Sequence, residues 1–554
     1  MELKGAEIIC ECLLEQGVDT VFGYPGGAAL NTYDALYKYS DRINHILTAH
    51  EQGASHAADG YARATGKTGV VITTSGPGAT NIVTGLATAH IDSIPLVAIT
   101  GNVNTDQLGR DSFQEVDIVD IVKPVTKASF LVKSIDALAD TIRRAFTIAN
   151  EGRKGPVLVD VPKDITAQTY SYEPVKPEGR QTVPVKNKES VAEALELIKH
   201  AERPIIYAGG GIISSDTSEK FRKFAELADA PVCCSLMGLG CIPADHRLNM
   251  GNIGMHGGYG TGVATSQCDL IIACGARFSD RVAGDREKFG SQAKIIQLDI
   301  DENEINKNVK VHNYILGDME SILDALCEDL PQQSHSDWVN KLNQLKEESE
   351  VKSQYPQFAS PKQVIDKVNS LKSGDDVFVT DVGQHQMWIA QYADVMCPRT
   401  LLTSGGMGTM GFGMGAAIGA QTAFPDKKVI LFTGDGSFHM NFNELVTLKS
   451  YNLPIIVIVM NNTVLGMVRQ WQKLFYGKRF SQTDPKRATD FLALASAFGI
   501  KGMSINSAEE VDAVLEKAFA LNEPVVIDCK ISPDENVLPM IPPGKTVDDI
   551  IVDM

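Results

Sequence analysis

Two stretches, Lys428-Val-Ile-Leu-Phe-Thr-Gly-Asp-Gly-Ser437 and Pro454-Ile-Ile-Val-Ile-Val-Met-Asn-Asn462, decide the fold. Each is an apolar run of strand length that ends in polar residues, and a helix-like stretch lies between them. This order predicts two parallel strands, which would bring Asp435 and Asn462 together at the carboxyl edge of a sheet. A carboxylate and an amide oxygen suit Mg²⁺, and the glycines let backbone N–H groups approach a diphosphate. The sequence therefore predicts a site for Mg²⁺ and a diphosphate at this edge.

By itself, a Gly-Asp-Gly turn is common, and its ordinary explanation is a strand-to-helix turn in which the aspartate caps the helix. The asparagine pair at the end of the next strand argues against that explanation. Together, the two strings resemble the signature of thiamine diphosphate (ThDP) enzymes, in which Gly-Asp-Gly precedes Asn-Asn. The resemblance implies that ThDP is the cofactor and that Mg²⁺ holds its diphosphate.

The composition is that of a large globular chain. Its 554 residues are enough for three or four domains, and 44% of them are apolar. The net charge of −18 disfavours nucleic acid, and no basic stripe or long apolar stretch indicates a membrane. The chain opens without a signal or transit segment, so we expect a cytoplasmic protein. Its ten cysteines form no CxxC pair, which argues against zinc and disulfides.

Two polar stretches, 170–188 and 331–361, divide the chain into segments 1–169, 189–330 and 362–554. Each segment alternates short β-branched runs with amphipathic stretches, as parallel α/β sheets do. The first and third segments look like divergent copies of one architecture. We therefore predict an α/β fold of three domains, each a mostly parallel sheet flanked by helices. A short helix is expected at 338–348, within the second linker.

The first segment contains a carboxylate in a catalytic context. Glu51 follows a strand and opens a helix, and its ordinary explanation is a glutamate that the helix macrodipole stabilises. ThDP chemistry needs a carboxylate against the aminopyrimidine ring, because this contact favours the imino tautomer that takes the proton of the thiazolium carbon. We predict that Glu51 supplies this carboxylate.

Further strings resemble one group of ThDP enzymes, the catalytic subunits of the acetohydroxyacid synthase (acetolactate synthase) family. These strings are His50-Glu-Gln-Gly-Ala54, Ser75-Gly-Pro-Gly-Ala-Thr-Asn81, Ser112-Phe-Gln-Glu115 and Gly23-Tyr-Pro-Gly-Gly27. The resemblance runs from about residue 3 to residue 540. It implies a pyrimidine-binding ThDP domain over 1–169, a central Rossmann-like FAD-binding domain over 189–330, and a diphosphate- and Mg²⁺-binding ThDP domain with a C-terminal arm over 362–554.

The resemblance also implies an assembly. Glu51 of one subunit would face the metal site of its partner, so we expect a homodimer with the active site at the subunit interface. Pairing of two dimers into a tetramer is left open. A separate regulatory small subunit is the second expected partner.

Roles for individual residues follow from the same resemblance. The substrate-site and catalytic residues are Glu51, Gln114, Phe113, Gly26, Lys127, Met410 and Trp471. The ThDP-binding residues are Pro25, Thr74, Pro77, Asn81, Gly383, Gln384, His385, Gly408, Gly434, Gly436, Ser437, Gly466 and Met467. The metal ligands are Asp435, Asn462 and the backbone carbonyl of Val464. The FAD-binding residues are Gly209, Gly210, Leu236, Met255, His256, Gly275, Ala276, Arg277, Arg281, Val282, Asp299, Ile300 and Asp318.

For several of these residues, a functional role and an ordinary structural explanation can both be stated. Gln114 could hydrogen-bond an oxyanion. Met410 would be the apolar wedge that bends ThDP, although without the resemblance a core methionine is the better explanation. Trp471 could cover the extra methyl of a larger acceptor, a gain of about 1 kcal/mol. Lys127, taken alone, is a solvated lysine. Arg277 and the glycines could neutralise a pyrophosphate.

The implied reaction is the decarboxylation of pyruvate and transfer of the hydroxyethyl unit to pyruvate or 2-oxobutanoate. Its products are 2-acetolactate or 2-aceto-2-hydroxybutanoate, in the biosynthesis of valine, leucine and isoleucine. FAD would be structural, because this ligation has no net redox step. The alternatives are a pyruvate oxidase with redox-active FAD and an inactive, cofactor-binding scaffold subunit. A pyruvate decarboxylase is disfavoured by the FAD strings, and a glyoxylate carboligase by Glu51.

Overall fold

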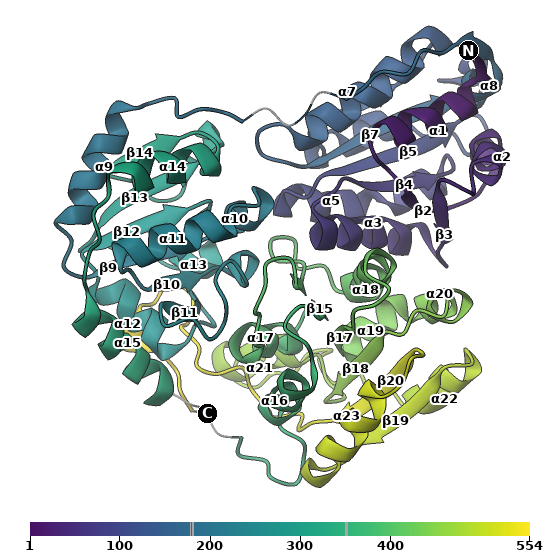
Figure 1. Cartoon of the computed structure of the whole chain (residues 1–554). Coiled ribbons are helices and arrows are strands. Elements are labelled where there is room, and N and C mark those ends of the chain that lie inside the picture. The colour runs from purple at the N-terminus through teal and green to yellow at the C-terminus, as the bar shows by residue number, and fades with distance from the viewer. Residues whose placement is uncertain (178, 180–181, 349–352, 554) are drawn as a thin grey trace.

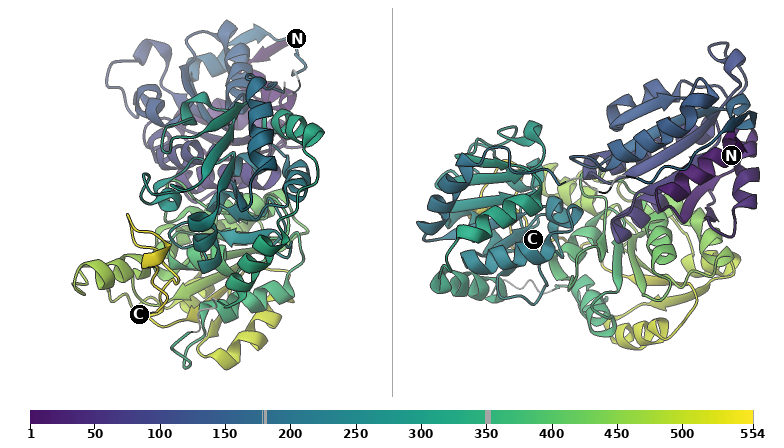
Figure 2. Two further views of the ribbon diagram at one scale, coloured as in Figure 1. Left: turned by 90° about the vertical axis from the view of Figure 1, so that its left-hand side faces the viewer. Right: turned by 45° about the horizontal axis from the view of Figure 1, so that its top comes forward.

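The computed structural model describes residues 1–177, 179, 182–348 and 353–553. Three α/β domains are arranged as a triangle, with the second domain standing beside the other two (Figures 1 and 2). Each domain has a six-stranded sheet, and all strand pairs within these three sheets are parallel. The predicted fold class is confirmed, whereas the exact domain limits stay a prediction.

The first sheet has the strand order β3-β2-β4-β5-β7-β6. Its strands are β2 (Thr20–Tyr24), β3 (Asn44–Leu47), β4 (Gly69–Thr73), β5 (Leu96–Asn102), β6 (Ala128–Leu131) and β7 (Pro156–Pro162). Its helices are α1 (Gly5–Glu15), α2 (Leu30–Lys38), α3 (Glu51–Thr65), α4 (Pro77–Asn81), α5 (Val83–Asp92), α6 (Ile118–Val122), α7 (Leu138–Asn150) and α8 (Lys163–Ala167). A separate antiparallel pair joins β1 (Glu2–Lys4) to β8 (Thr169–Ser171).

The second sheet has the order β11-β10-β9-β12-β13-β14, which reverses between β9 and β12. Dinucleotides bind at such a reversal in doubly wound sheets. Its strands are β9 (Pro204–Ala208), β10 (Val232–Cys234), β11 (Asn249–Asn252), β12 (Leu270–Cys274), β13 (Lys294–Asp299) and β14 (Asn313–Leu316). Its helices are α9 (Glu189–Lys199), α10 (Gly210–Ser214), α11 (Ser218–Ala228), α12 (Tyr259–Gln267), α13 (Asp280–Ala283), α14 (Met319–Asp329) and α15 (Ser336–Glu348).

The third sheet has the order β16-β15-β17-β18-β20-β19. Its strands are β15 (Val377–Thr380), β16 (Leu401–Leu402), β17 (Val429–Gly434), β18 (Ile456–Asn461), β19 (Lys501–Ile505) and β20 (Val525–Lys530). Its helices are α16 (Pro361–Leu371), α17 (Gln384–Tyr392), α18 (Phe412–Ala423), α19 (Asp435–Asn441), α20 (Leu445–Ser450), α21 (Gly466–Phe475), α22 (Phe491–Ala497) and α23 (Val511–Phe519). When the strands are numbered in sequence order within each domain, the third sheet has the same strand order as the first. The likeness between the two segments predicted this.

The first and third domains are joined through α3 and α18, which pack backbone against backbone. A Cβ at Gly60 would lie 2.5 Å from Cα of Ala416, and a Cβ at Gly419 would lie 2.6 Å from the backbone nitrogen of Tyr61. Glycine is needed here because real side chains do not approach backbone atoms so closely. The two helices belong to one hydrophobic core that runs through both domains.

One feature differs from the sequence-based expectation. The helix expected in the linker 331–361 is α15, and it packs on the second domain, where the buried Trp338 donates to the carbonyl of Pro204 at 3.1 Å. That part of the linker therefore belongs to the second domain. Residues 178 and 180–181 of the first linker, and 349–352 of the second, lie outside the described residues. Within the described residues, no helix has the length and apolar character needed to cross a membrane.

Candidate functional site

The carboxyl ends of β17 and β18 form a polar corner. These strands are parallel neighbours, and Gly434 pairs with Met460 just before the two strands end. The carboxylate of Asp435 accepts the backbone N–H of Asn462, and burial raises the pKa of Asp435 to about 6. The side-chain oxygen of Asn462 accepts the N–H of Val464 at 3.1 Å. Asp435 and Asn462 therefore lie together, as the two-strand argument predicted, and Val464 lies beside them.

A second turn, at the start of α17, completes this corner. The Nδ2 of Asn462 donates to Oε1 of Gln384 at 3.1 Å. Burial lowers the pKa of His385 to about 3, so the ring is neutral, and its Nε2 has no hydrogen-bond partner within the described parts of the chain. A Cβ at Gly434 would lie 3.0 Å from Nδ1 of this ring. An orphaned buried nitrogen beside a glycine turn suits a polar ligand group such as a diphosphate.

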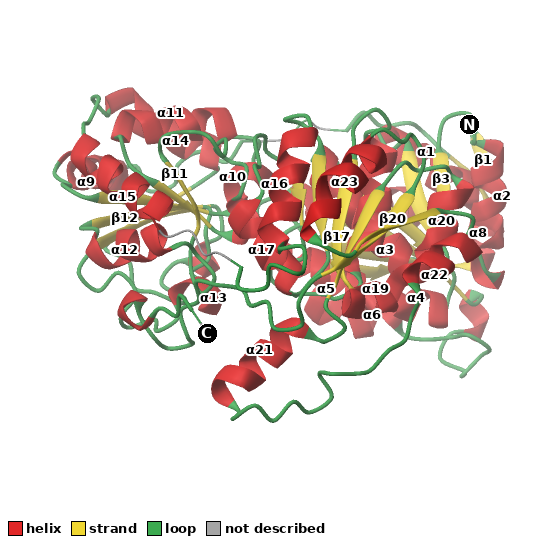
Figure 3. Cartoon of the chain, turned by 90° about the horizontal axis from the view of Figure 1, so that it is seen from below, coloured by secondary structure: helices red, strands yellow, loops and turns green. Residues whose placement is uncertain are grey.

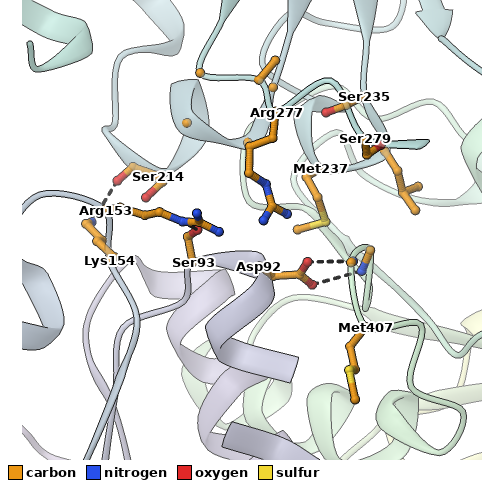
Figure 4. A pocket seen from close by; sticks show the side chains of 18 of the residues that line it. Asp92, Ser93, Arg153, Lys154, Ser214, Ser235, Met237, Arg277, Ser279 and Met407 are labelled. Atoms are coloured by element: carbon orange, nitrogen blue, oxygen red, sulfur yellow. Dashed lines mark hydrogen bonds between the residues drawn. The ribbon is translucent and has the colours of Figure 1, made fainter. Parts of the chain in front are cut away.

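Met410 lies on the loop 403–411, which precedes α18. A Cβ at Gly436 would lie 3.7 Å from Cε of Met410, so the loop reaches the corner formed by Asp435. The first domain fixes this loop, because Asp92 accepts the N–H groups of Gly405 at 3.0 Å and Gly406 at 2.8 Å. Figure 4 shows these two bonds.

Two further interdomain bonds hold the same loop. The hydroxyls of Thr88 and Thr409 are 2.7 Å apart. Arg63, which is buried and paired with both Asp59 and Asp92, donates to the carbonyl of Thr403 at 2.8 Å. Helices α3 and α5 therefore hold the loop at both ends.

A cavity of about 2070 Å³ lies between the three domains. At one end it is lined by Asp299, Ile300 and Asp318, after β13 and β14 of the second sheet. At the other end it is lined by Gly383, Gly408, Met410, Met467 and Trp471. All the predicted FAD-binding residues line this one cavity, including Gly209, Gly210, Leu236, Met255, His256, Gly275, Ala276, Arg277, Arg281 and Val282. The strand-end turns of the second domain and the Met410 loop thus share one space.

The cavity wall is positively charged beside the turns that follow β9 and β12. Gly275 has φ +56°, and a Cβ at Gly211 would lie 2.7 Å from its Cα, so the two turns touch. Arg277 points into the cavity beside Arg153 (Figure 4). Its pKa is lowered by burial and by the charge of Arg153, and Arg277 forms no hydrogen bond or ion pair with any residue that the structure describes. An unpaired, half-buried guanidinium fits an anionic group such as a pyrophosphate.

Orphaned polar atoms occur near Met255 too. The Nδ1 of His256 and Oδ1 of Asn252 are buried in the wall without a hydrogen-bond partner among the described residues. Burial lowers the pKa of His256 to about 4, and the charge of Arg281 adds to the shift. The guanidinium of Arg281 also lies 5.7 Å from the ring centroid of Trp471, so the second and third domains meet here. Figure 3 shows α21, which carries Trp471, projecting from the third domain.

The predicted residues of the first domain, apart from Lys127, form a second group outside this cavity. Nδ2 of Asn81 donates to Oε2 of Glu51 at 3.0 Å. A Cβ at Gly78 would lie 3.4 Å from Oε1 of Glu51 and 2.7 Å from the methyl of Thr74. A Cβ at Gly26 would lie 2.5 Å from Cβ of Thr74, so Pro25 and Gly26 lie on the same edge.

Gln114 belongs to this second group. A Cβ at Gly76 would lie 2.9 Å from the carbonyl oxygen of Gln114, which places Gln114 against the turn that leads into Pro77. Phe113 is 88% exposed. Tyr24, Leu30 and Leu47 are exposed as well. The first domain therefore presents Glu51 and Gln114 on an edge with exposed apolar side chains.

Comparison with known proteins shows the family to which this chain belongs. Residues 3–121, 191–326 and 381–529 match the N-terminal TPP binding domain, the central domain and the C-terminal TPP binding domain of the thiamine pyrophosphate enzymes. The chain is 45% identical to the probable acetolactate synthase large subunit of Methanocaldococcus jannaschii, over 99% of this chain and 95% of that protein. It is 44% identical to the acetolactate synthase isozyme 2 large subunit of Escherichia coli K12, over 99% of both chains.

The chain belongs to the acetolactate synthase large-subunit family of the thiamine pyrophosphate enzymes. It is therefore a ThDP-dependent transferase, and its two TPP-binding domains establish ThDP as its cofactor. The predicted family is confirmed, and the roles of single residues stay predictions.

Lys127 is bound at the end of a helix of its own domain. The half-buried ammonium donates to the carbonyls of Ile148 and Glu151, at the end of α7. Burial lowers the pKa of Lys127. These contacts stabilise the C-terminus of a helix, and Lys127 is not among the residues that line the central cavity. The structure thus gives this lysine a structural explanation, and its role at a substrate entrance stays a prediction.

Two residues of this acetolactate synthase site were not predicted from the sequence. Arg153 lines the cavity, and its guanidinium is held by Ser93 at 2.8 Å and Glu304 at 2.8 Å. Asp92 tethers the Met410 loop from the first domain. Neither lies in a strand-end motif, and their partners are distant in sequence, so no local pattern marks them.

Proposed function

We propose that this chain decarboxylates pyruvate and transfers the hydroxyethyl unit to pyruvate or 2-oxobutanoate, with Mg²⁺ and FAD as further cofactors. The single observation that carries the proposal is the continuous cavity that joins the nucleotide-type turns of the second domain to Met410 and Trp471. A ThDP enzyme with a built nucleotide site next to its reaction centre fits a flavin-containing synthase.

Mg²⁺ would be held by Asp435, Asn462 and the carbonyl of Val464. The raised pKa of Asp435 supports this, because a buried carboxylate without a cation is unfavourable and a divalent ion would stabilise its charge. His385 and Gln384 would contact the diphosphate from the neighbouring turn, together with Ser437, whose hydroxyl is fixed on the carbonyl of Val382 at 2.8 Å.

ThDP, when bound, supplies a nucleophilic thiazolium carbon and an electron sink for decarboxylation. Glu51 would hold a proton at the aminopyrimidine nitrogen and so favour the imino tautomer. Gln114 would hydrogen-bond the substrate oxygen on which negative charge develops. Gly26 would leave room beside the reacting carbon, and a side chain at this position would also collide with Thr74.

FAD would lie along the cavity, with Arg277 and Arg153 beside its pyrophosphate and Asp299 beside a ribose hydroxyl. Burial raises the pKa of Asp299 to about 6, and its carboxylate accepts only from nearby backbone N–H groups in the described structure. A hydroxyl donor would stabilise this carboxylate. The flavin end would meet His256 and Met255, whose neighbourhood has orphaned polar atoms. We propose a structural role for FAD, since the ligation has no net redox step.

The active unit would be a homodimer. The group around Glu51 lies outside the cavity of its own chain and has exposed apolar neighbours, including Phe113 and Leu47. A partner subunit would cover this edge and receive Glu51. The relatives named above are large subunits, so we also propose a separate small subunit as partner.

Product analysis tests the proposal. Purified protein receives pyruvate and 2-oxobutanoate with ThDP, Mg²⁺ and FAD, under air and under argon. Equal formation of acetolactate and acetohydroxybutanoate in both gases supports the synthase. Acetate or acetyl phosphate formed with oxygen uptake would identify a pyruvate oxidase, and cofactor binding without release of CO₂ would identify an inactive scaffold.

A further inference from the structure

Glu444 is a buried carboxylate that belongs to neither group of predicted site residues. It ends the short helix Phe442–Glu444, which follows α19 directly. Its side chain is fully buried, and no Lys or Arg of the described residues forms an ion pair with it. Burial raises the pKa of Glu444. A buried carboxylate without a cation is unfavourable unless hydrogen bonds stabilise it.

The hydrogen bonds of Glu444 reach into the other domain. Its Oε2 accepts the backbone N–H of Ala49 at 3.0 Å, and its Oε1 accepts the N–H of His50 at 3.1 Å. The hydroxyl of Thr447 also donates to Oε2, at 2.7 Å. Ala49 and His50 are the two residues directly before Glu51, so the third domain holds the backbone N–H groups of both residues that precede the proposed catalytic carboxylate.

The carboxylate also contacts the first turn of α3. A Cβ at Gly53 would lie 2.6 Å from the carboxylate carbon of Glu444, so no side chain fits between them. An anion at the N-terminus of a helix is stabilised by the helix macrodipole. This contact fixes the start of α3 relative to the third domain.

On its other side, the one side-chain hydrogen bond of Glu51 within the described residues comes from a neighbour in its own domain. Nδ2 of Asn81 donates to the Glu51 carboxylate at 3.0 Å. The segment before Glu51 has two more bonds to the third domain: the hydroxyl of Tyr451 accepts the N–H of Leu47 at 2.8 Å and donates to the carbonyl of His45 at 3.4 Å. Glu444 therefore holds the two residues directly before Glu51, whereas Tyr451 holds residues farther back in the segment.

We infer that Glu444 is a positioning residue for the proposed catalytic Glu51: it fixes the two peptide groups that precede Glu51 through paired hydrogen bonds from the third domain. The inference rests on the proposed function, because it needs Glu51 to act on ThDP. Glu444 also connects the segment before Glu51 to the Asp435 corner of the same chain, because α19 runs from Asp435 to the short helix that ends in Glu444.

The test uses Glu444→Gln in the full chain, with Glu444→Asp beside it. The Gln variant keeps one acceptor oxygen and turns an NH₂ group towards the second N–H. The Asp variant keeps the charge but shortens the reach by one methylene. Tyr451→Phe is the matched control, because it removes both hydrogen bonds of the Tyr451 hydroxyl to the same segment and leaves the N–H groups of Ala49 and His50 paired with Glu444.

Three quantities are measured. Deuterium exchange of the backbone over residues 45–52 in cofactor-free protein should accelerate in both Glu444 variants. The exchange rate of the C2 proton of bound ThDP, measured without substrate, should fall by about 10- to 100-fold, because displacement of a catalytic group by about 1 Å has effects of that size. The KM for pyruvate should stay within about twofold, and Tyr451→Phe should keep the C2 exchange of the unaltered protein.

Glu51→Gln separates this inference from the proposed function. If Glu51→Gln leaves C2 exchange unchanged, the assignment of Glu51 is wrong. If Glu51→Gln slows it while soluble Glu444→Gln and Glu444→Asp proteins keep the normal rate, Glu51 stands and the positioning role of Glu444 is refuted. Should Glu444→Gln fail to fold, the Asp variant alone decides in the same way.

Discussion

The replacement of Asp92 by alanine should destabilise the protein and loosen the Met410 loop. The buried carboxylate of Asp92 accepts from Arg63 at 3.0 Å, from the N–H of Gly405 at 3.0 Å and from the N–H of Gly406 at 2.8 Å. Alanine removes all three bonds. Breaking a buried ion pair from one side typically costs about 3–5 kcal/mol.

Two structural details place the effect at the lower end of that range. Arg63 keeps its second carboxylate, Asp59, and so is not left unpaired. Gly406 is exposed, so water can replace the bond to its N–H. The main losses are one charge-assisted bond and the orphaned N–H of Gly405, and we expect the free energy of unfolding to fall by about 3 kcal/mol.

The assay combines urea unfolding with ThDP titration. Asp92→Ala should need more ThDP for half-maximal activity and should have a lower kcat, because the loop that carries Met410 loses its tether. Thr88→Val is the control: it removes one neutral bond to Thr409 in the same region, worth about 1 kcal/mol. A loss below about 1 kcal/mol in Asp92→Ala, with unchanged ThDP dependence, would refute the reasoning that the first domain holds this loop.

Three further predictions concern single side chains. Glu51→Gln should lower kcat by about 10²- to 10⁴-fold in a folded protein, the usual contribution of acid–base catalysis, and steady-state kinetics with near-normal kcat would exclude the proposed role. Trp471→Leu should reduce the preference for 2-oxobutanoate over pyruvate by about tenfold in a competition assay, since one methyl contact is worth about 1 kcal/mol or more; an unchanged product ratio would place the specificity elsewhere. Burial raises the pKa of Asp160 from 3.8 to about 7. Between about pH 4 and pH 7 the native state therefore keeps a proton on Asp160 that the unfolded chain releases. As a result, Asp160 makes the free energy of unfolding fall as pH rises through this range, by at most about 1.4 kcal/mol per pH unit. Asp160→Asn should flatten that part of the slope in urea unfolding at a series of pH values, and parallel curves for the two proteins would contradict the pKa.

Much of the fold could be read from the ends of apolar runs. The runs at 429–432 and 455–459 became β17 and β18, and the polar residues that follow them meet as expected, because parallel strands end at a shared edge. β16, in contrast, has only two residues, Leu401–Leu402, which is too short for any period to appear. It is a strand only because β15 lies beside it.

The interdomain contacts could not be predicted in this way. Asp92 and Gly405 are 313 positions apart, and Glu444 and Ala49 are 395 apart. Periodicity reports how a segment meets its neighbours along the chain, and it carries no information about which distant backbone group a carboxylate accepts from. The resemblance to known enzymes indicated which residues would contact cofactors. The residues that hold them in place could be identified only from the three-dimensional structure.

The glycine contacts between α3 and α18 have a consequence for how this chain loses its structure. Because the two helices touch through backbone atoms and share one core, the first domain cannot separate from the third without exposing buried main chain on both. The second domain has two larger cores of its own, and the apolar cluster that it shares with the third domain, formed by Met255, Leu538 and Met540, is small. Calorimetry should therefore resolve two melting units, and the first and third domains, although distant in sequence, should melt as one.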